Sequence, residues 1–164
     1  MSLTDELKRD DYDFWRGDIL GRVEKSVIIR APPERVWEML AFDNHLEWMD
    51  GCKSVEYTSK VYSPKDKYKV GATAHITEHV TYDLEIIESL ENEKMTYRFD
   101  VRRISMMVTY ILEPIEDGTR FTYALEYEMH WSILGKIIEK LYYRRHMEKE
   151  YERSLKNFKS ILEK

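Results

Sequence analysis

The sequence predicts an α+β fold: a curved antiparallel sheet of six to seven strands, two short helices after the first strand, and one long C-terminal helix packed on the sheet. Two observations lead to this fold. Residues 52–130 alternate apolar and polar positions without any helical segment between the runs, which favours antiparallel pairing of neighbours. Beyond residue 135 the apolar positions change to a helical spacing. At 164 residues the chain can bury one core.

Composition excludes several classes of protein. The net charge is −5 and no Lys/Arg block stands apart from acidic neighbours, so a nucleic-acid surface is not expected. No apolar run approaches the length of about 18 residues that spans a membrane, and the N-terminus has no signal-peptide core. The single cysteine, Cys52, cannot form an internal disulfide, which predicts a reducing compartment, the cytoplasm. We interpret Cys52 as structural rather than nucleophilic.

The first elements follow from caps and breakers. Residues 1–20 are interpreted as an N-terminal arm or short helix, in which Phe14 and Trp15 dock onto the body. Residues 22–30 alternate and end in a β-branched cluster, which predicts a strand. Pro33 then suits the first position of a short helix, because its missing N–H is not needed there.

A second short helix follows at once. Asp43 or Asn44 can cap it, Leu46 and Trp48 lie within it, and Gly51 ends it. Six strands come next, separated by turn residues of which Asp-Gly at 117–118 is the clearest. These strands are VEYTS, GATAHITEH, YDLEIIESL, KMTYRFDV, SMMVTYILEP and TRFTYALEYEMH. No breaker marks the boundary near 79–82, so one long bent strand is an alternative there. The charged segment 60–70 is a candidate entrance loop or an ordinary surface loop.

The C-terminal helix carries one apolar stripe with a polar middle. Its stripe consists of Ile137, Leu141, Arg144, Glu148, Tyr151, Leu155, Phe158 and Leu162. The polar middle is RRHMEKE, at 144–150. Either these charges form a solvated face, or Arg144, Arg145 or Glu148 lies over an internal pocket.

The segment His75-Ile-Thr-Glu-His79 matches H-x-x-E-H, a zinc-binding pattern of some metalloproteases when it is helical. Here it lies in a strand-like run. Two strand residues four positions apart lie about 13 Å from one another, at roughly 3.3 Å per residue. That separation is too large for one zinc ion, so we predict no metal site.

Several segments resemble the START-like (SRPBCC) superfamily, whose members have the helix-grip fold. The resemblance rests on VEKSVIIRAPPERVWEML, VGATAHITEH and YILEPIEDGTRFTYALEY. The closing helix is similar to that of the polyketide cyclase/dehydrase branch. The resemblance covers roughly residues 22–164, and we assign residues 21–164 to a START-like ligand-binding domain. It implies an elongated hydrophobic cavity between the sheet and the long helix, which in this superfamily holds lipids, sterols, polyketides, quinones or plant hormones.

The residues themselves also favour a cavity. Tyrosines inside a sheet need hydroxyl partners, and methionines suit a pocket that adapts to a flexible ligand. The predicted cavity residues are Trp48, Tyr57, Glu78, Met106, Val108, Tyr110, Phe121, Tyr123, Leu125, Tyr127, Ile138, Leu141 and Arg144. Glu78 shares the phase of Ala74 and Ile76, which would make it a polar handle in the cavity. The alternative is that the strand ends before Glu78 and leaves it in solvent.

Two functions fit these expectations. The first is a non-catalytic carrier or sensor that binds a hydrophobic small molecule such as a lipid, polyketide or quinone. The second is a polyketide cyclase/dehydratase-type enzyme that uses acid–base residues in the same cavity, with Arg144 and Tyr127 or Tyr110 as candidates. A third hypothesis is an accessory protein that contacts another macromolecule. We predict no cofactor and assign no catalytic residue, and the oligomeric state is left open.

Overall fold

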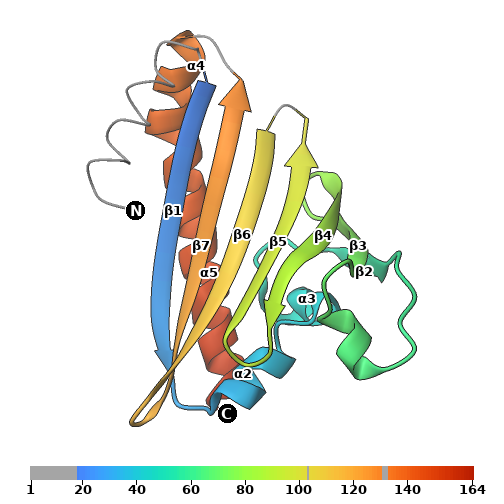
Figure 1. Cartoon of the computed structure of the whole chain (residues 1–164). Coiled ribbons are helices and arrows are strands. Elements are labelled where there is room, and N and C mark those ends of the chain that lie inside the picture. Colours follow the sequence, from blue (N-terminus) through green and yellow to red (C-terminus); the bar gives the residue numbers. More distant parts are fainter. Residues whose placement is uncertain (1–17, 103, 131–132) are drawn as a thin grey trace.

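The computed structural model describes residues 18–102, 104–130 and 133–164 (Figure 1). Within these residues the predicted fold is confirmed: one antiparallel sheet, two short helices after its first strand, and a long C-terminal helix that packs on the sheet. The strands are β1 Asp18–Ile29, β2 Ser54–Tyr57, β3 Thr73–Thr77, β4 Thr81–Leu90, β5 Lys94–Val101, β6 Ile104–Ile115 and β7 Gly118–His130. The predicted contacts of Phe14 and Trp15 lie outside the described residues.

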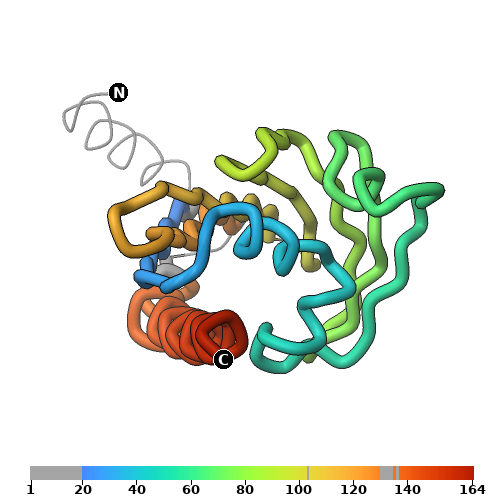
Figure 2. The backbone as a smooth tube through the Cα atoms, turned by 90° about the horizontal axis from the view of Figure 1, so that it is seen from below, coloured from blue at the N-terminus to red at the C-terminus, as the bar shows by residue number. Residues whose placement is uncertain are grey.

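The seven strands are ordered β1-β7-β6-β5-β4-β3-β2, and every neighbouring pair is antiparallel. Strands β2 to β7 therefore form a meander, and β1 joins its last strand, with Gly21 opposite Tyr127. Figure 2 shows the sheet curving from β7 round to β3 and β2. The segment that holds the short helices lies between the β2–β3 end of the sheet and the long helix, and α3 contacts both β2 and α5. The boundary near 79–82 separates two strands, β3 and β4, as predicted, and not the alternative of one long bent strand, because residues 78–80 form a turn.

The short helices are α2 (Pro33–Glu38) and α3 (His45–Trp48), preceded by a 3-10 turn at Phe42–Asn44. Pro33 is the first residue of α2, as predicted. Trp37 of α2 is buried and stacks on Tyr68 at 5.5 Å between ring centroids, which anchors the 60–70 segment. A 3-10 turn at Pro64–Lys67 orders that segment further, and none of its residues lines the cavity described below.

The C-terminal helix consists of α4 (Ile133–Ile138), a π-helical segment (Glu139–Tyr143) and α5 (Arg144–Leu162). The predicted stripe is right for the buried Leu155, Phe158 and Leu162 and wrong for Ile137 and Leu141, which are 53% and 50% exposed. A π-helical turn holds an extra residue, so it rotates the preceding turns about the helix axis relative to α5. That rotation carries the N-terminal part of the stripe out to solvent.

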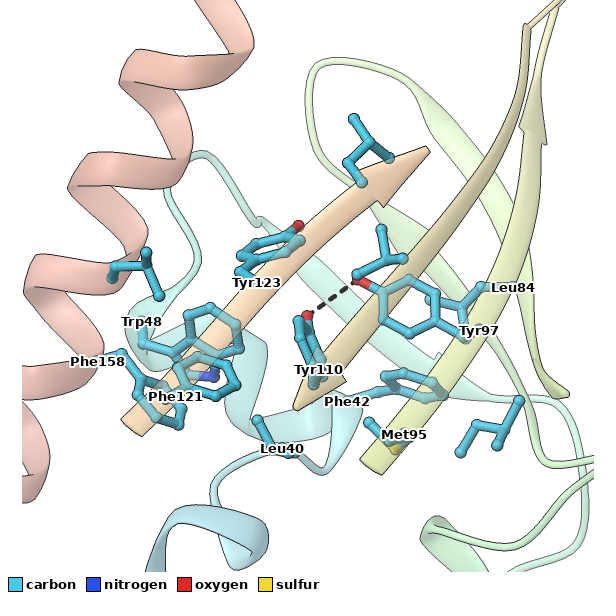
Figure 3. Packing of buried hydrophobic residues seen from close by; sticks show 14 of the residues in the cluster. Leu40, Phe42, Trp48, Leu84, Met95, Tyr97, Tyr110, Phe121, Tyr123 and Phe158 are labelled. Atoms are coloured by element: carbon cyan, nitrogen blue, oxygen red, sulfur yellow. Dashed lines mark hydrogen bonds between the residues drawn. The ribbon is translucent and has the colours of Figure 1, made fainter. Parts of the chain in front are cut away.

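Aromatic side chains fill the end of the interior next to the short helices (Figure 3). Trp48 of α3 meets Phe158 of α5 edge to face at 4.7 Å, and Phe158 stacks on Phe121 of β7 at 4.6 Å. All three are fully buried. This cluster fixes α5 to both the sheet and α3, and it leaves the other end of the inner face open for a cavity.

Candidate ligand-binding site

A cavity of about 650 Å³ lies between the long helix and the inner face of the sheet. Small-molecule sites have volumes of about 300–1,000 Å³, so this space is large enough for a ligand. The residues that line it come from the sheet, the long helix and two turns. They are Met49, Asp50, Glu78, His79, Val80, Tyr82, Tyr97, Phe99, Val101, Arg102, Ile104, Met106, Tyr123, Tyr143, His146, Met147, Glu150, Tyr151 and Ser154.

The sheet wall is aromatic because alternate residues of β4 and β5 point inward. Tyr82 stacks on Phe99 with ring centroids 4.4 Å apart, and Phe99 lies 6.0 Å from Tyr97 in the same stacked arrangement. The hydroxyl of Tyr97 is 3.0 Å from that of Tyr110, as the dashed line in Figure 3 shows. The hydroxyl group of Tyr97 therefore has a hydrogen-bond partner within the protein and needs none from a ligand.

The helix wall is built from α5 and the π-helical segment. Tyr151 stacks on Tyr123 of β7 at 4.3 Å, so this pair closes the boundary between helix and sheet. Three methionines from different elements also line the space, Met49, Met106 and Met147. Unbranched thioether side chains adapt to ligands of varied shape, which suits a site for flexible apolar molecules.

Glu78 is the polar residue of greatest interest. Strand β3 ends at Thr77, and the Glu78 N–H donates to the Val80 carbonyl at 3.0 Å in the turn that follows. The side chain lines the cavity, and the Tyr82 hydroxyl donates to its Oε1 at 2.8 Å. Burial raises the pKa of Glu78 above its ordinary value. The strand thus ends before Glu78, yet the carboxyl turns inward rather than into solvent.

The other carboxylates of the cavity are paired. Asp50 accepts from Nε of Arg153 at 2.6 Å. Glu150 of α5 lies 3.1 Å from Nε2 of His146 and 3.5 Å from Nε2 of His79. The last contact joins the β3–β4 turn to α5 at the rim, where His79 is exposed.

Among the predicted cavity residues, Glu78, Met106 and Tyr123 lie together in the lining. Five others are buried in the core and do not line it: Trp48, Val108, Tyr110, Phe121 and Leu125. Tyr57 lies outside the cavity as well, and its hydroxyl accepts the Phe42 N–H at 2.9 Å. Ile138 and Leu141 are exposed.

Tyr127 and Arg144 meet in a separate cluster near the π-helical segment. The Tyr127 hydroxyl donates to Oε1 of Glu139, a carboxyl that is only 4% exposed. Nε of Arg144 lies 3.7 Å from the same oxygen. The Tyr127 ring also contacts Tyr143 edge to face at 5.7 Å, and Tyr143 lines the cavity. These two predicted residues therefore support the wall rather than face the space.

Sequence reasoning missed several lining residues. Tyr97, Phe99 and Val101 share one phase of β5, so alternation alone could have identified them. Met147 and Tyr143 could not be found this way, because no residue pattern marks the π-helical segment.

The H-x-x-E-H segment holds no shared ligand site. His75 lies on β3 and pairs with Asp83 of β4 at 2.7 Å, whereas His79 lies in the turn beside Glu150. Among the described residues, no group of three His, Cys, Asp or Glu side chains is arranged to hold a metal ion. Burial raises the pKa of Cys52 to about 11, so its thiolate is scarce at neutral pH.

Comparison with known proteins identifies the family. The sequence profile described as "Polyketide cyclase / dehydrase and lipid transport" matches residues 21–163. The chain belongs to this family. The resemblance to the START-like superfamily and its polyketide cyclase/dehydrase branch is thereby confirmed, and family membership implies a hydrophobic ligand. No curated protein matches the chain. None of the described helices is long and apolar enough to cross a membrane.

Solved structures share the fold. SA2116 of Staphylococcus aureus, a protein of unknown function, has a TM-score of 0.70 at 14% identity, covering 89% of this chain and 95% of its own. TTHA0849 of Thermus thermophilus has a TM-score of 0.65 at 20% identity, with coverage of 88% and 97%. CV1439 of Chromobacterium violaceum has a TM-score of 0.63 at 15% identity, with coverage of 87% and 97%. At such identities the likeness shows the fold alone.

Proposed function

We propose that the protein binds a hydrophobic small molecule, such as a lipid, polyketide or quinone, in the cavity between the long helix and the sheet, and carries or senses it unchanged. The observation that carries this proposal is an interior space of about 650 Å³ walled by stacked aromatic rings and methionines. Transfer of apolar surface from water into such a space stabilises a complex by roughly 25 cal/mol per Å² buried, before the costs of association. The cytoplasmic location predicted from the single cysteine is a separate expectation, and the proposed binding does not rest on it.

Native mass spectrometry of protein purified from its own organism tests this proposal. We expect an added mass that organic solvent releases and that can then be identified. A Met106→Trp variant, which fills the cavity, should lose the added mass. Met107→Trp is the matched control, because Met107 is the next residue of β6 and does not line the cavity.

The proposal fails if the wild-type protein carries no small molecule and also binds no neutral apolar probe. It fails equally if the added mass persists in Met106→Trp and disappears in Met107→Trp.

One observation favours a second candidate, a cyclase or dehydratase. Glu78 and Tyr82 form a hydrogen-bonded acid pair inside the cavity, and a carboxyl with a raised pKa can serve as a general acid. Incubation with a reactive poly-β-ketone, followed by mass analysis of products, separates the candidates. Conversion that Glu78→Gln slows would support the enzyme, whereas wild-type turnover no faster than the uncatalysed reaction would support the carrier.

A further inference from the structure

The ionisable groups of the cavity are unevenly paired. Asp50 has Arg153 as a partner, and Glu150 has His146 and His79. None of the ion pairs formed by the described residues includes Glu78. A carboxylate in such a position has lost part of its hydration without gaining a cation.

Glu78 also has unused hydrogen-bonding capacity. A carboxylate can accept about four hydrogen bonds, and the described side chains supply one, from Tyr82 to Oε1. Among the residues that the structure describes, Nε of Arg144 is the only side-chain nitrogen or oxygen atom that is fully buried and has no hydrogen-bond partner. The second oxygen of Glu78 is not in this class. The second oxygen of Glu78 is therefore not sealed in the protein but accessible from the cavity that it lines.

The surroundings of Glu78 favour positive charge further. Tyr82 presents its stacked ring beside the carboxyl that it binds, and Tyr123 and Tyr151 form a second stacked pair in the lining. Aromatic faces attract cations, most strongly where water is excluded. Burial is the largest cause of the raised pKa of Glu78, and Glu150 raises that pKa further, whereas the hydrogen bond from Tyr82 and the neighbouring His79 oppose the rise.

We propose that the cavity selects hydrophobic molecules that carry a protonated amine, with the ammonium group bound to Glu78 and the apolar body between the aromatic walls. This inference rests on the proposed function, since it needs an apolar ligand in the cavity. An anionic amphiphile would instead bring a second negative charge towards Glu78. Arg102, an exposed lining residue in the β5–β6 turn, is the group that would hold such an anion.

Three ligands with the same dodecyl chain test the inference: dodecylamine, dodecanol and dodecanoate. The affinity of each ligand is measured by its displacement of the neutral fluorescent probe N-phenyl-1-naphthylamine from the full chain. The titrations are done at neutral pH and below the concentration at which the ligand forms micelles. A hydrogen bond to a charged group contributes enough to make the amine bind about 10- to 100-fold more tightly than the alcohol. In Glu78→Gln that preference should fall to about threefold or less, because the amide keeps an acceptor for Tyr82 but not the charge.

Glu56→Gln is the matched control. It removes one negative charge from an exposed position on β2, outside the cavity, and should leave the amine preference unchanged. Equal binding of amine and alcohol overturns the inference, as does a preference that survives in Glu78→Gln. Tighter binding of dodecanoate also overturns it and points to Arg102. In these cases displacement by dodecanol still supports the proposed function. A bound probe that dodecylamine fails to displace overturns the inference alone. If no probe binds to a wild-type protein that also carries no small molecule, the proposed function fails and the inference fails with it.

Discussion

Gly21 lies directly opposite Tyr127 in the β1–β7 ladder, and the tyrosine ring covers the place where a side chain at position 21 would project. A Cβ atom on residue 21 would lie 1.9 Å from Cζ of Tyr127 and 2.2 Å from its hydroxyl oxygen. Glycine inside a strand often marks such a close approach. We therefore expect Gly21→Ala to displace Tyr127.

The size of the effect follows from what Tyr127 would lose. Carbon atoms in contact lie about 3.5–4.0 Å apart, so the ring tip must move by roughly 1.5–2 Å. Such a movement breaks the hydrogen bond from Tyr127 to the buried Glu139, and hydrogen bonds to charged groups contribute about 1.5–3 kcal/mol. Alanine itself favours the strand over glycine by roughly 0.5–1 kcal/mol. The net expectation is a loss of about 1–2 kcal/mol in the free energy of unfolding.

A double-mutant cycle measured by urea denaturation isolates this cause. In a Tyr127→Ala background no ring covers position 21, so Gly21→Ala should become neutral or stabilising by up to about 1 kcal/mol. The sign of the alanine effect thus depends on Tyr127. An equal loss of stability in both backgrounds would refute the reasoning, because the cost would then arise in the β1 backbone and not from the ring.

Three further predictions concern the helix, the cavity carboxyl and the buried tyrosines. Leu155→Ala should cost about 2–5 kcal/mol in denaturant unfolding, whereas Leu141→Ala should stay within about 0.5 kcal/mol; similar costs would contradict the rotation at the π-helical segment. Because folding raises the pKa of Glu78 above its ordinary value of 4.5, its ionisation opposes folding, and stability should fall as pH rises through the interval between those two pKa values. Glu78→Gln should match the wild-type stability below that interval and exceed it above, and parallel pH profiles of the two proteins would exclude this effect. Tyr110→Phe should lower the free energy of unfolding by about 1–3 kcal/mol, and by more than Tyr97→Phe, because the Tyr110 hydroxyl lies between the Tyr97 hydroxyl and the buried His45. Thermal unfolding that ranks the two variants in the opposite order would contradict this network.

The sheet could be predicted because its signals are local. Period-two alternation and the Asp-Gly turn identify β6 and β7, and Pro33 identifies the start of α2. The same alternation argued against a zinc site at His75 and His79, because it placed both residues in a strand. In the structure His75 pairs with Asp83 and His79 lies beside Glu150.

The position of the cavity along the strands could not be predicted. Alternation indicates which residues face inward, but Met106 and Tyr110 share that phase and only Met106 lines the space. The difference arises because Trp48 of α3 and Phe158 in the C-terminal part of α5 fill the end of the inner face next to the short helices. That packing joins residues far apart in the sequence, so no local pattern reports it.

The extra residue of the π-helical segment is a second reason why the lining of the cavity could not be predicted from the sequence. It changes which side of the long helix faces the sheet, and so exposes Leu141 while Tyr143 and Met147 line the cavity. A single amphipathic stripe drawn along the whole helix assumes an unbroken spacing of about 3.6 residues per turn. Glu78 shows the opposite case, since its phase pointed inward and the turn after β3 keeps it there.

Methionine methyl resonances offer the most direct test of a ligand-binding cavity. Three methionines line the cavity: Met49, Met106 and Met147. Two others serve as controls, because Met95 is fully buried in the core and Met107, which is paired with Arg98 of β5, does not line the cavity. In protein labelled with ¹³C at the methionine methyl groups, titration with dodecanol should shift the three lining resonances together and leave Met95 and Met107 in place. Unchanged lining resonances, or shifts confined to Met107, would contradict binding between the long helix and the sheet.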